Sequence, residues 1–338
     1  MNVFLTGSTG LLGINIIHVL LAHGHEVLAL VRNPEKAKQV LPDDPRITVI
    51  PGDIESPQEW LPRLQEADAL IHGAAYFREF FGPGDHEARL RKLNIEFPVQ
   101  LTAEANRYGL KKAVMISSSS VIAPRPDGSP ATEEDPPCAP EPENRYSVSK
   151  QEMEEALAKI APISQCPIII IRPGWMFGPY DYAPTAAGGL VKELVEKRSA
   201  QMAAGTPLGI ADVRDVAEGT VRALEKCDRS ETFNLTGNML SADEALKMIA
   251  QQIPGAKAQI MPLPMAFMVS RVLEVVSGIL NKPNPIPRVG LLAIGKGVPV
   301  SAEKAKRELG VSFRPFAETA KDTVSFFQNQ YPRFVASR

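Results

Sequence analysis

Short apolar runs recur along the first half of the chain, and polar or amphipathic segments separate them. The six runs cover residues 2–5, 25–31, 47–50, 69–72, 113–116 and 167–171. None of them alternates apolar with polar positions, which is typical of strands that are covered on both faces. Helical patterns lie between them at 58–65, 87–108 and 145–160. This alternation predicts an α/β fold with a doubly wound parallel sheet.

Beyond Arg172 the pattern is less regular. A helical pattern at 185–197 is followed by a connection with Gly and Pro that leads to Leu208. A further helix opens at 212–217, and residues 231–235 have the composition of a late strand.

The C-terminal third is predicted to be mostly helical. Ser241 and Glu244 have the spacing of a capping box and predict a helix that reaches Gln252. Residues 262–338 contain an apolar helix, a proline-rich turn and two terminal helices. We therefore expect a sheet domain and a smaller, mostly helical substrate-binding portion, formed respectively by 1–175 with 211–237 and by 176–210 with 238–338.

A glycine-rich turn at 6–13, Thr-Gly-Ser-Thr-Gly-Leu-Leu-Gly, joins the first strand to the first helix. Gly7 would permit the tight turn, Gly10 would let backbone approach a pyrophosphate, and Gly13 would let the helix pack closely on its strand. Free N–H groups and the positive end of the helix dipole at residues 10–12 would hold the phosphates. A strand, a glycine-rich turn and a helix in this order predict a Rossmann-type dinucleotide site.

Composition narrows the functional classes. The 338 residues carry 37 basic and 39 acidic side chains without a basic tract, so no nucleic-acid partner and no anionic-membrane surface is indicated. Cys138, Cys166 and Cys227 are far apart and odd in number, which fits a reducing compartment and predicts neither disulfides nor a metal site. Because Met1 leads directly into a strand and polar residues interrupt the apolar stretch 263–280, we expect a cytoplasmic protein with no signal peptide and no membrane span.

Tyr146 and Lys150 are candidate catalytic residues. They lie four positions apart on a predicted helix and so share one face. A phenol with a pKa of about 10 is a poor proton donor or acceptor at neutral pH, and a neighbouring ammonium is expected to lower that pKa. Tyr146 would then be a general acid in carbonyl reduction or a general base in alcohol oxidation. Tyr-x-x-x-Lys alone also occurs by chance, and the dinucleotide loop gives it weight.

Four serines, Ser117 to Ser120, follow the fifth strand, where side chains reach the ligand crevice of an open α/β sheet. A hydroxyl there can donate a hydrogen bond to a substrate carbonyl oxygen and stabilise developing negative charge. Chemistry alone does not choose among the four serines, and a turn or capping role is the ordinary alternative.

Two irregular stretches are expected near the same end of the sheet. Residues 76–91 form an expected substrate-side loop, with the aromatic side chains Tyr76, Phe77, Phe80 and Phe81. The alternative is a surface loop held by its own aromatic residues. Residues 123–144 contain seven prolines and are expected to form an extended, mobile loop.

Taken together, these motifs resemble the extended short-chain dehydrogenase/reductase family, within the NAD(P)-dependent epimerase/dehydratase superfamily. The glycine turn, the serine run and the Tyr146/Lys150 pair carry the resemblance, which is strongest to dihydroflavonol-reductase-like members. Further matches are Gly52-Asp53, His72 to Ala75, Asn94, Arg172 to Pro179, Asp212 to Ala217 and Ala302 to Gly310. The resemblance covers nearly the whole chain and implies an enzyme, and family members commonly dimerise through the helices near 87–108 and 145–160.

Roles follow from the resemblance and the pattern of the chain together. The implied catalytic set is Ser118, Tyr146, Lys150 and Asn94, in which Lys150 also holds the nicotinamide ribose. The expected cofactor site comprises Thr6, Gly7, Thr9, Gly10, Leu11, Leu12, Gly13, Arg32, Asp53, Ile54, Ala74, Ala75, Tyr146, Lys150 and Pro173. The expected substrate site comprises Tyr76, Phe77, Ser118, Tyr146 and Trp175.

The end of the second strand bears Arg32 and no acid. A carboxylate there would accept hydrogen bonds from the adenosine ribose diol and repel a 2′-phosphate, whereas a guanidinium binds that phosphate. Arg32, helped by Asn33 and Lys36, therefore favours NADP(H) over NAD. The ordinary alternative is a solvated arginine at a strand end.

The resulting hypothesis is an NADPH-dependent reductase of a small-molecule aldehyde or ketone. Tyr146 would supply the proton, Ser118 would polarise the carbonyl oxygen, and Lys150 would tune the pKa of Tyr146. The aromatic loop and the apolar helix after Pro262 favour an apolar substrate. Two alternatives stay open, a nucleotide-sugar epimerase or dehydratase with a retained NAD, and a non-catalytic nucleotide-sensing protein of the same fold.

Overall fold

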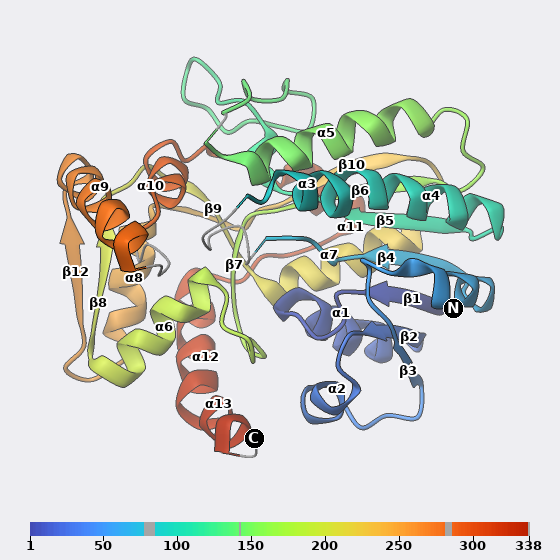
Figure 1. The fold of residues 1–338 in the computed structure, drawn as a ribbon, viewed down its shortest axis with the longest axis horizontal. Coiled ribbons are helices and arrows are strands. Elements are labelled where there is room, and N and C mark those ends of the chain that lie inside the picture. The colour runs from blue at the N-terminus through green and yellow to red at the C-terminus, as the bar shows by residue number, and fades with distance from the viewer. Residues whose placement is uncertain (78–84, 142, 281–285, 337–338) are drawn as a thin grey trace.

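A seven-stranded parallel sheet forms the centre of the molecule (Figure 1). The structure, a computed structural model, describes residues 1–77, 85–141, 143–280 and 286–336. The strands of the sheet are β1 Asn2–Thr6, β2 Glu26–Val31, β3 Ile47–Pro51, β4 Ala69–His72, β5 Lys112–Ile116, β6 Ile168–Pro173 and β10 Glu231–Leu235. Their order is β10-β6-β5-β4-β1-β2-β3, and all neighbours are parallel. The predicted doubly wound sheet is confirmed.

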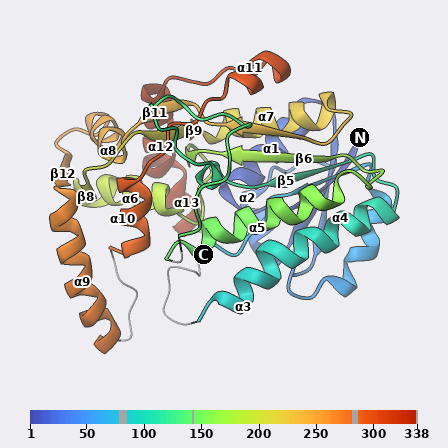
Figure 2. The ribbon, with the colours of Figure 1, turned by 90° about the horizontal axis from the view of Figure 1, so that it is seen from above.

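Helices cover both faces of this sheet, as two perpendicular views show (Figures 1 and 2). One face carries α1 Leu11–Ala22, α7 Val213–Lys226 and α11 Glu303–Leu309. The other carries η2 Leu61–Glu66, α4 Phe97–Arg107 and α5 Arg145–Ile160. Val3 and Leu5 of β1 pack into the first core, and Phe4 packs into the second, where its ring stacks on Trp60 at 5.5 Å. Burial on both faces explains why the strands read as continuous apolar runs.

Two predicted helices have more internal structure than their periodicity indicated. The pattern at 87–108 is one helical stretch made of α3 Glu87–Leu90, the π-helical η4 Arg91–Glu96 and α4. The helical pattern at 58–65 corresponds to two 3₁₀ segments, η1 Pro57–Glu59 and η2, and not to one α-helix. Two shorter elements, α2 Pro34–Val40 and the 3₁₀ turn η5 Ser119–Val121, follow β2 and β5.

The C-terminal part contains short strands as well as helices. The strands form two small sheets, one of β7 Trp175–Phe177, β9 Leu208–Asp212 and β11 Asn238–Leu240, and one of β8 Ser199–Ala203 and β12 Lys257–Met261. The helices are α6 Ala186–Lys197, α8 Ala242–Gln251, α9 Leu263–Leu280, α10 Arg288–Gly295, α12 Phe316–Asn329 and α13 Tyr331–Ala336. The connection expected before Leu208 contains β8, a strand that was not predicted. The capping box is confirmed, since Ser241 and Glu244 exchange both hydrogen bonds.

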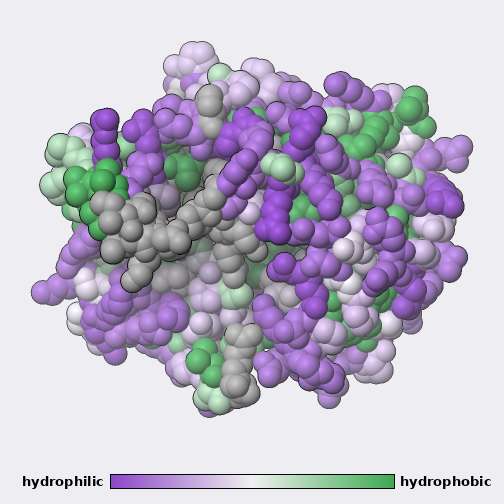
Figure 3. Space-filling model, in the orientation of Figure 1, coloured by the Kyte–Doolittle hydropathy of each residue, from purple (hydrophilic) through white to green (hydrophobic). Residues whose placement is uncertain are grey.

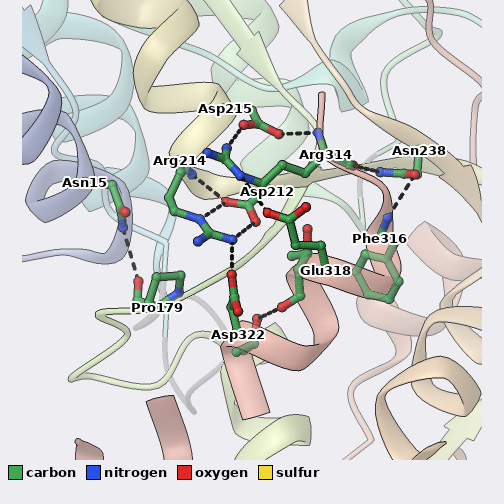
Figure 4. Close-up of polar contacts among 12 residues, drawn as sticks. Asn15, Pro179, Asp212, Arg214, Asp215, Asn238, Arg314, Phe316, Glu318 and Asp322 are labelled. Carbon is green, nitrogen blue, oxygen red and sulfur yellow. Dashed lines mark hydrogen bonds and ion pairs between the residues drawn. The ribbon is translucent and has the colours of Figure 1, made fainter. Parts of the chain in front are cut away.

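A polar network fastens the C-terminal helix α12 to the start of α7 (Figure 4). Arg214 pairs with Asp212 at 2.7 Å and with Asp322 of α12 at 2.8 Å. The carboxylate of Asp215 is buried, accepts the backbone N–H of Arg314 at 2.7 Å and pairs with the guanidinium of the same residue. These contacts explain the polar 212–217 motif as a structural junction.

Among the described residues, no helix combines the length and the apolar character that crossing a membrane requires.

Candidate active site

A large cavity lies at the carboxyl ends of the parallel strands, where α/β sheets bind ligands. Its volume is about 1770 Å³, whereas a pocket for one small ligand typically has ~300–1000 Å³. The glycine turn 6–13 lines one part of the cavity, and residues of α9 and α10 line another. The cavity is large enough for a dinucleotide together with a substrate.

Nearly all of the predicted site residues line this cavity. They are Gly7, Thr9, Gly10, Leu11, Leu12, Gly13, Arg32, Asp53, Ile54, Ala74, Ala75, Tyr76, Phe77, Ser118, Tyr146, Lys150, Pro173 and Trp175. Thr6 and Asn94 are absent from the wall and are buried behind it. The chain thus brings the expected cofactor, catalytic and substrate residues into one space.

Thr6 has a structural role that was not predicted from the sequence. Its fully buried hydroxyl lies 2.8 Å from Nδ1 of His72 and accepts the backbone N–H of Ala74 at 3.2 Å. Burial, and to a lesser degree the charge of Lys150, lowers the pKa of His72 to about 3, so this ring is neutral. Thr6 therefore fastens the glycine turn to the end of β4, and its expected place in the cofactor site stays a prediction.

Asn94 acts on Tyr76 and does not reach the cavity. Its Oδ1 accepts the backbone N–H of Tyr76 at 2.8 Å, and its Nδ2 donates to the carbonyl of Tyr76 at 3.0 Å and to Ser149 Oγ at 3.2 Å. It lies in the π-helical turn η4, a feature that often marks functional sites. Asn94 thus fixes the backbone of Tyr76, and its expected place in the catalytic set stays a prediction.

The three glycines of the turn differ in how closely the protein surrounds them. Gly7 has a φ of +77°, and a side chain there would meet backbone of Gly73 and Ala74 at 2.8 Å. A side chain at Gly13 would overlap the carbonyl oxygen of Gly7. At Gly10 the nearest atom to a Cβ would be that same oxygen at 3.3 Å. Gly7 and Gly13 are therefore required by packing, whereas Gly10 leaves space on the cavity side.

The N-terminus of α1 suits a phosphate. Gly10 is the N-cap, and no side chain caps the helix. The first N–H groups of α1, from Leu11 onward, thus have no side-chain acceptor, and they lie where Gly10 to Gly13 line the cavity. Backbone donors and the helix dipole both favour an anion at this point, so the residues fit the pyrophosphate of a dinucleotide.

Arg32 lies on the cavity wall directly after β2, with Lys36 beside it on the wall. Its side chain is exposed, and within the described ranges its guanidinium has no carboxylate partner. Asn33 caps α2 by accepting the N–H of Lys36 at 3.0 Å, so its side chain supports the helix. Asp53 and Ile54 line the wall after β3, where Asp53 accepts the N–H of Glu55 at 2.9 Å.

The four serines after β5 have different partners. The hydroxyl of Ser117 is buried and donates to Glu154. Ser147 donates to the hydroxyl of Ser120 at 3.1 Å. Among the described residues, the Ser118 hydroxyl bonds to Ser120, whose Oγ lies at 2.9 Å and whose backbone N–H it accepts at 3.2 Å as the cap of η5. Ser118 is half-buried on the cavity wall. The bond to Glu154 occupies the Ser117 hydroxyl, whereas Ser118 also caps the turn, and the catalytic role of Ser118 stays a prediction.

Tyr146 and Lys150 both line the cavity from α5, but their electrostatics differ from the expectation. The Nζ of Lys150 lies 5.9 Å from the Tyr146 ring centroid and donates to the carbonyl of Ile116 at 2.8 Å. Burial raises the pKa of Tyr146 above its ordinary value, contrary to the predicted lowering by the ammonium. Burial also lowers the pKa of Lys150 to about 8, against the opposing effect of Glu154. The phenol is thus protonated and the lysine is charged at neutral pH.

Glu154 is a functional candidate that sequence reasoning missed. It lies four residues after Lys150 on α5 and accepts two hydrogen bonds from Arg172 Nε, at 3.0 and 3.1 Å. Only 11% of the Glu154 side chain and 13% of the Arg172 side chain are exposed. With Ser117 bound to the same carboxylate, this cluster fixes α5 against the ends of β5 and β6. The four-residue spacing after Lys150 was a signal that could have identified it.

Apolar side chains form the walls beyond Tyr146. The Phe77 ring lies 4.5 Å from the Tyr146 ring, and Trp175 packs edge-to-face on Phe177. Further wall residues come from the predicted substrate-side segments and include Pro124, Ala183, Val269, Leu273 and Leu292. Tyr76 is largely buried, and its hydroxyl lies 2.6 Å from Nδ1 of His86. Phe80 and Phe81, expected here, lie outside the described residues.

The proline-rich stretch 123–144 borders the cavity through Pro124, Cys138, Ala139, Glu141 and Asn144. Backbone bridges join Ile122 to Pro137 and Ala131 to Val300, and Ala131 is fully buried. The stretch thus lies at the predicted end of the sheet and is tied to the C-terminal part of the chain.

Sheet order, glycine turn and the Tyr146/Lys150 pair define a Rossmann-fold, NAD(P)-dependent oxidoreductase of the short-chain dehydrogenase/reductase type. The chain belongs to the NAD dependent epimerase/dehydratase family, whose model matches residues 3–236. This membership confirms the resemblance of the motifs.

Individual relatives of the chain differ in their activities. A putative dihydroflavonol 4-reductase of Synechocystis sp. is 28% identical over 96% of this chain and 94% of that protein. The 4-hydroxy-2-methyl-3-oxo-4-farnesyl-3,4-dihydroquinoline-1-oxide ketoreductase of Stigmatella aurantiaca is 26% identical over 93% of this chain and 92% of that protein. Among solved structures, the UDP-glucuronic acid 4-epimerase of Bacillus cereus in complex with NAD superposes on this chain with a TM-score of 0.76. The superposition covers 98% of this chain and 100% of the epimerase chain at 20% sequence identity, so the similarity is one of fold.

Proposed function

We propose that the protein is an NADPH-dependent reductase of apolar aldehydes or ketones. The observation that carries this proposal is the pairing of cations on the cavity wall. Apart from Arg32, Lys36 and Lys150, the described cations on the wall are Arg89, which lies 3.7 Å from Glu55, and Lys296, which pairs with Glu141. Within the described residues these two cations are therefore already paired and are not free for the diphosphate of a nucleotide sugar, whereas the apolar side chains of the wall suit an apolar carbonyl compound.

Arg32 and Lys36 support NADP(H) as the cofactor. A guanidinium without a carboxylate partner can bind a 2′-phosphate through two donors, and the adjacent ammonium adds attraction. The N-terminus of α1 would hold the pyrophosphate, and Asp53 would contact the adenine. Residues 1–175 with 211–237 would bind this cofactor, and 176–210 with 238–338 would build the substrate side.

The chain's own groups supply the acid chemistry of reduction. Bound NADPH supplies the hydride. Ser118 would donate a hydrogen bond to the substrate oxygen and stabilise its developing negative charge. Tyr146, kept protonated by its raised pKa, would donate the proton to that oxygen, and the ammonium of Lys150 would stabilise the resulting phenolate. The apolar wall around Phe77 would exclude water from this transfer.

The names of two relatives agree with this reaction class, since one is a putative dihydroflavonol 4-reductase and the other a ketoreductase. Both cover more than nine tenths of this chain.

A two-part experiment tests the proposal. Purified protein is denatured and any released nucleotide is identified, and the native protein is then screened with apolar aldehydes and ketones plus NADPH, followed by nicotinamide absorbance. We expect little retained NAD and oxidation of NADPH with at least one apolar carbonyl compound. Stoichiometric retained NAD together with conversion of a nucleotide sugar would contradict the proposal and favour the epimerase alternative.

A further inference from the structure

Helix α9 presents a row of apolar side chains to solvent. They are Met265, Met268, Val272, Val275 and Val276, with exposed fractions from 42% to 66%. At 100° per residue, these positions fall within an arc of about 100° on one side of the helix. Figure 3 shows the corresponding apolar patch at the left edge of the molecule, over α9. These five belong to a set of eight large exposed hydrophobic residues in the described ranges, so the concentration on one helix is marked.

The adjacent side of the same helix faces the cavity. Ala266, Val269 and Leu273 line the cavity wall. Ser270 is buried and donates a hydrogen bond to the carbonyl of Ile286 at 2.7 Å, which holds α9 against the residues before α10. A single helix therefore separates the cavity from the exposed apolar row, and the two apolar surfaces adjoin each other around its circumference.

We propose that the outer face of α9 docks on the surface of a lipid bilayer, with the helix lying in the interfacial plane. An amphipathic helix with a wide apolar face and charged residues at its border has this behaviour in general. Arg271 is exposed and lies beside the apolar row on the helix, where its head can stay among lipid headgroups, and Glu274, also exposed, lies further round the helix. Arg271 has no ion-pair partner in the described ranges, so it is available to a lipid phosphate.

Area argues against a second copy of the chain as the occupant. Five medium-sized side chains, each partly exposed, present a few hundred Å², whereas a stable protein interface buries roughly 800 Å² on each partner. A bilayer needs no complementary protein surface and binds an apolar row of this size directly. The near-balanced charge of the chain fits this mode, because the docking depends on apolar contact and one local cation.

Docking would place the apolar cavity beside the lipid phase. If the proposed carbonyl reductase activity holds, on which this step rests, lipophilic aldehydes or ketones dissolved in the membrane would reach the cavity past α9. Docking itself does not depend on that activity.

Vesicle flotation tests the docking. The full-length protein is mixed with phosphatidylcholine vesicles, with and without phosphatidylglycerol, and compared with the double variant Met268→Glu/Val272→Glu. The matched control is Ile163→Glu, an exposed apolar residue (81%) away from α9. We expect the wild type and Ile163→Glu to float with vesicles and the double variant to lose at least about tenfold in its partition coefficient.

Three outcomes overturn the docking proposal. These are absence of flotation of the wild type, unchanged flotation of the double variant, and a dimer in size-exclusion chromatography that the double variant abolishes. NADPH binding by each variant verifies its fold, because Met268 and Val272 do not line the cavity. Turnover of a water-soluble carbonyl compound is measured in parallel and should be the same in all three proteins, so failure of the reductase proposal is distinguished from failure of docking.

Discussion

The ammonium of Lys150 donates a hydrogen bond of 2.8 Å to the carbonyl oxygen of Ile116, the last residue of β5. This bond joins α5 to the strand that leads into the serine run. It also holds a positive charge in a buried place, where burial lowers the pKa of Lys150 to about 8. Keeping the Lys150 ammonium charged beside Tyr146 therefore lowers the free energy of unfolding.

That effect makes the stability of the fold depend on pH. The unfolded chain binds the Lys150 proton more tightly than the folded chain, with pKa values of 10.5 and about 8. Stability should therefore rise with pH across this window, by an upper bound of about 3 kcal/mol from this group. Lys150→Met removes this titrating group. Denaturant unfolding at several pH values should therefore show that the free energy of unfolding of the wild type rises relative to that of the variant between these two pKa values. Lys38→Met, at an exposed lysine, should follow the wild type, and parallel curves for Lys150→Met would refute the assignment.

Glu154→Gln should destabilise the fold and alter the pH profile together. The substitution leaves the buried Arg172 without its carboxylate, which typically costs about 3–5 kcal/mol. It also removes the charge that opposes the lowering of the Lys150 pKa, so the alkaline limb of kcat/KM should move to lower pH. Urea unfolding and a pH profile check both effects. Glu155→Gln, an exposed neighbour on α5, is the control and should change stability by less than about 0.5 kcal/mol.

The sheet and the cofactor half of the site were predictable because their signals are local. Six strands of the central sheet appear as apolar runs in the sequence. The glycine turn at 6–13 locates the cofactor half of the site within a few residues. Gly7 was assigned to the tight turn and Gly13 to close packing of the helix, and the structure has a positive φ at Gly7 and close backbone neighbours at both positions. The seventh strand, β10, was also recognised as a late strand.

The two small sheets and the cluster of Glu154, Arg172 and Ser117 could not be predicted in the same way. β8 pairs with β12, nearly sixty residues later, and both strands are short and partly exposed, so neither has a clear apolar pattern. The pKa of Tyr146 was assigned the wrong direction, because spacing placed Lys150 nearby and could not show the burial that outweighs its charge. Distances between side chains and the burial of ionisable groups depend on tertiary packing, and the spacing of residues along the sequence does not show that packing.

Gly10→Ala and Gly13→Ala should separate cofactor binding from folding. A Cβ at Gly13 would overlap the Gly7 carbonyl, so this variant should lose about 1–3 kcal/mol of stability or more. A Cβ at Gly10 meets that oxygen at 3.3 Å, so the fold should tolerate it, while the methyl group would obstruct the pyrophosphate. Thermal unfolding and NADPH titration measure the two effects. Equal losses of affinity and stability in both variants would show that Gly10 is not part of a phosphate cradle.

Arg32→Asp should change cofactor preference from NADP(H) towards NAD(H). The carboxylate would repel a 2′-phosphate and accept hydrogen bonds from the ribose diol, which the free guanidinium does not do. We expect the ratio of dissociation constants for NADPH and NADH to change by at least about tenfold, equivalent to 1.4 kcal/mol. Arg333→Asp, at an exposed arginine of α13 away from the cavity wall, serves as the charge-matched control. An unchanged ratio would mean that Arg32 is only a solvated arginine.

Tyr146→Phe should remove the proton donor and leave the rest of the cavity in place. The phenol lies against Phe77 and has a raised pKa, so in the wild type it stays protonated where Lys150 is charged. Loss of a general acid typically lowers the rate by about 10²–10⁴-fold, and we expect a fall of this size in kcat for carbonyl reduction. NADPH affinity should stay close to that of the wild type, because the ring and the neighbouring Lys150 remain. Tyr108→Phe, at the end of α4, is the matched control and should retain activity. If Tyr146→Phe keeps near-wild-type turnover, another group donates the proton and the proposed mechanism is wrong.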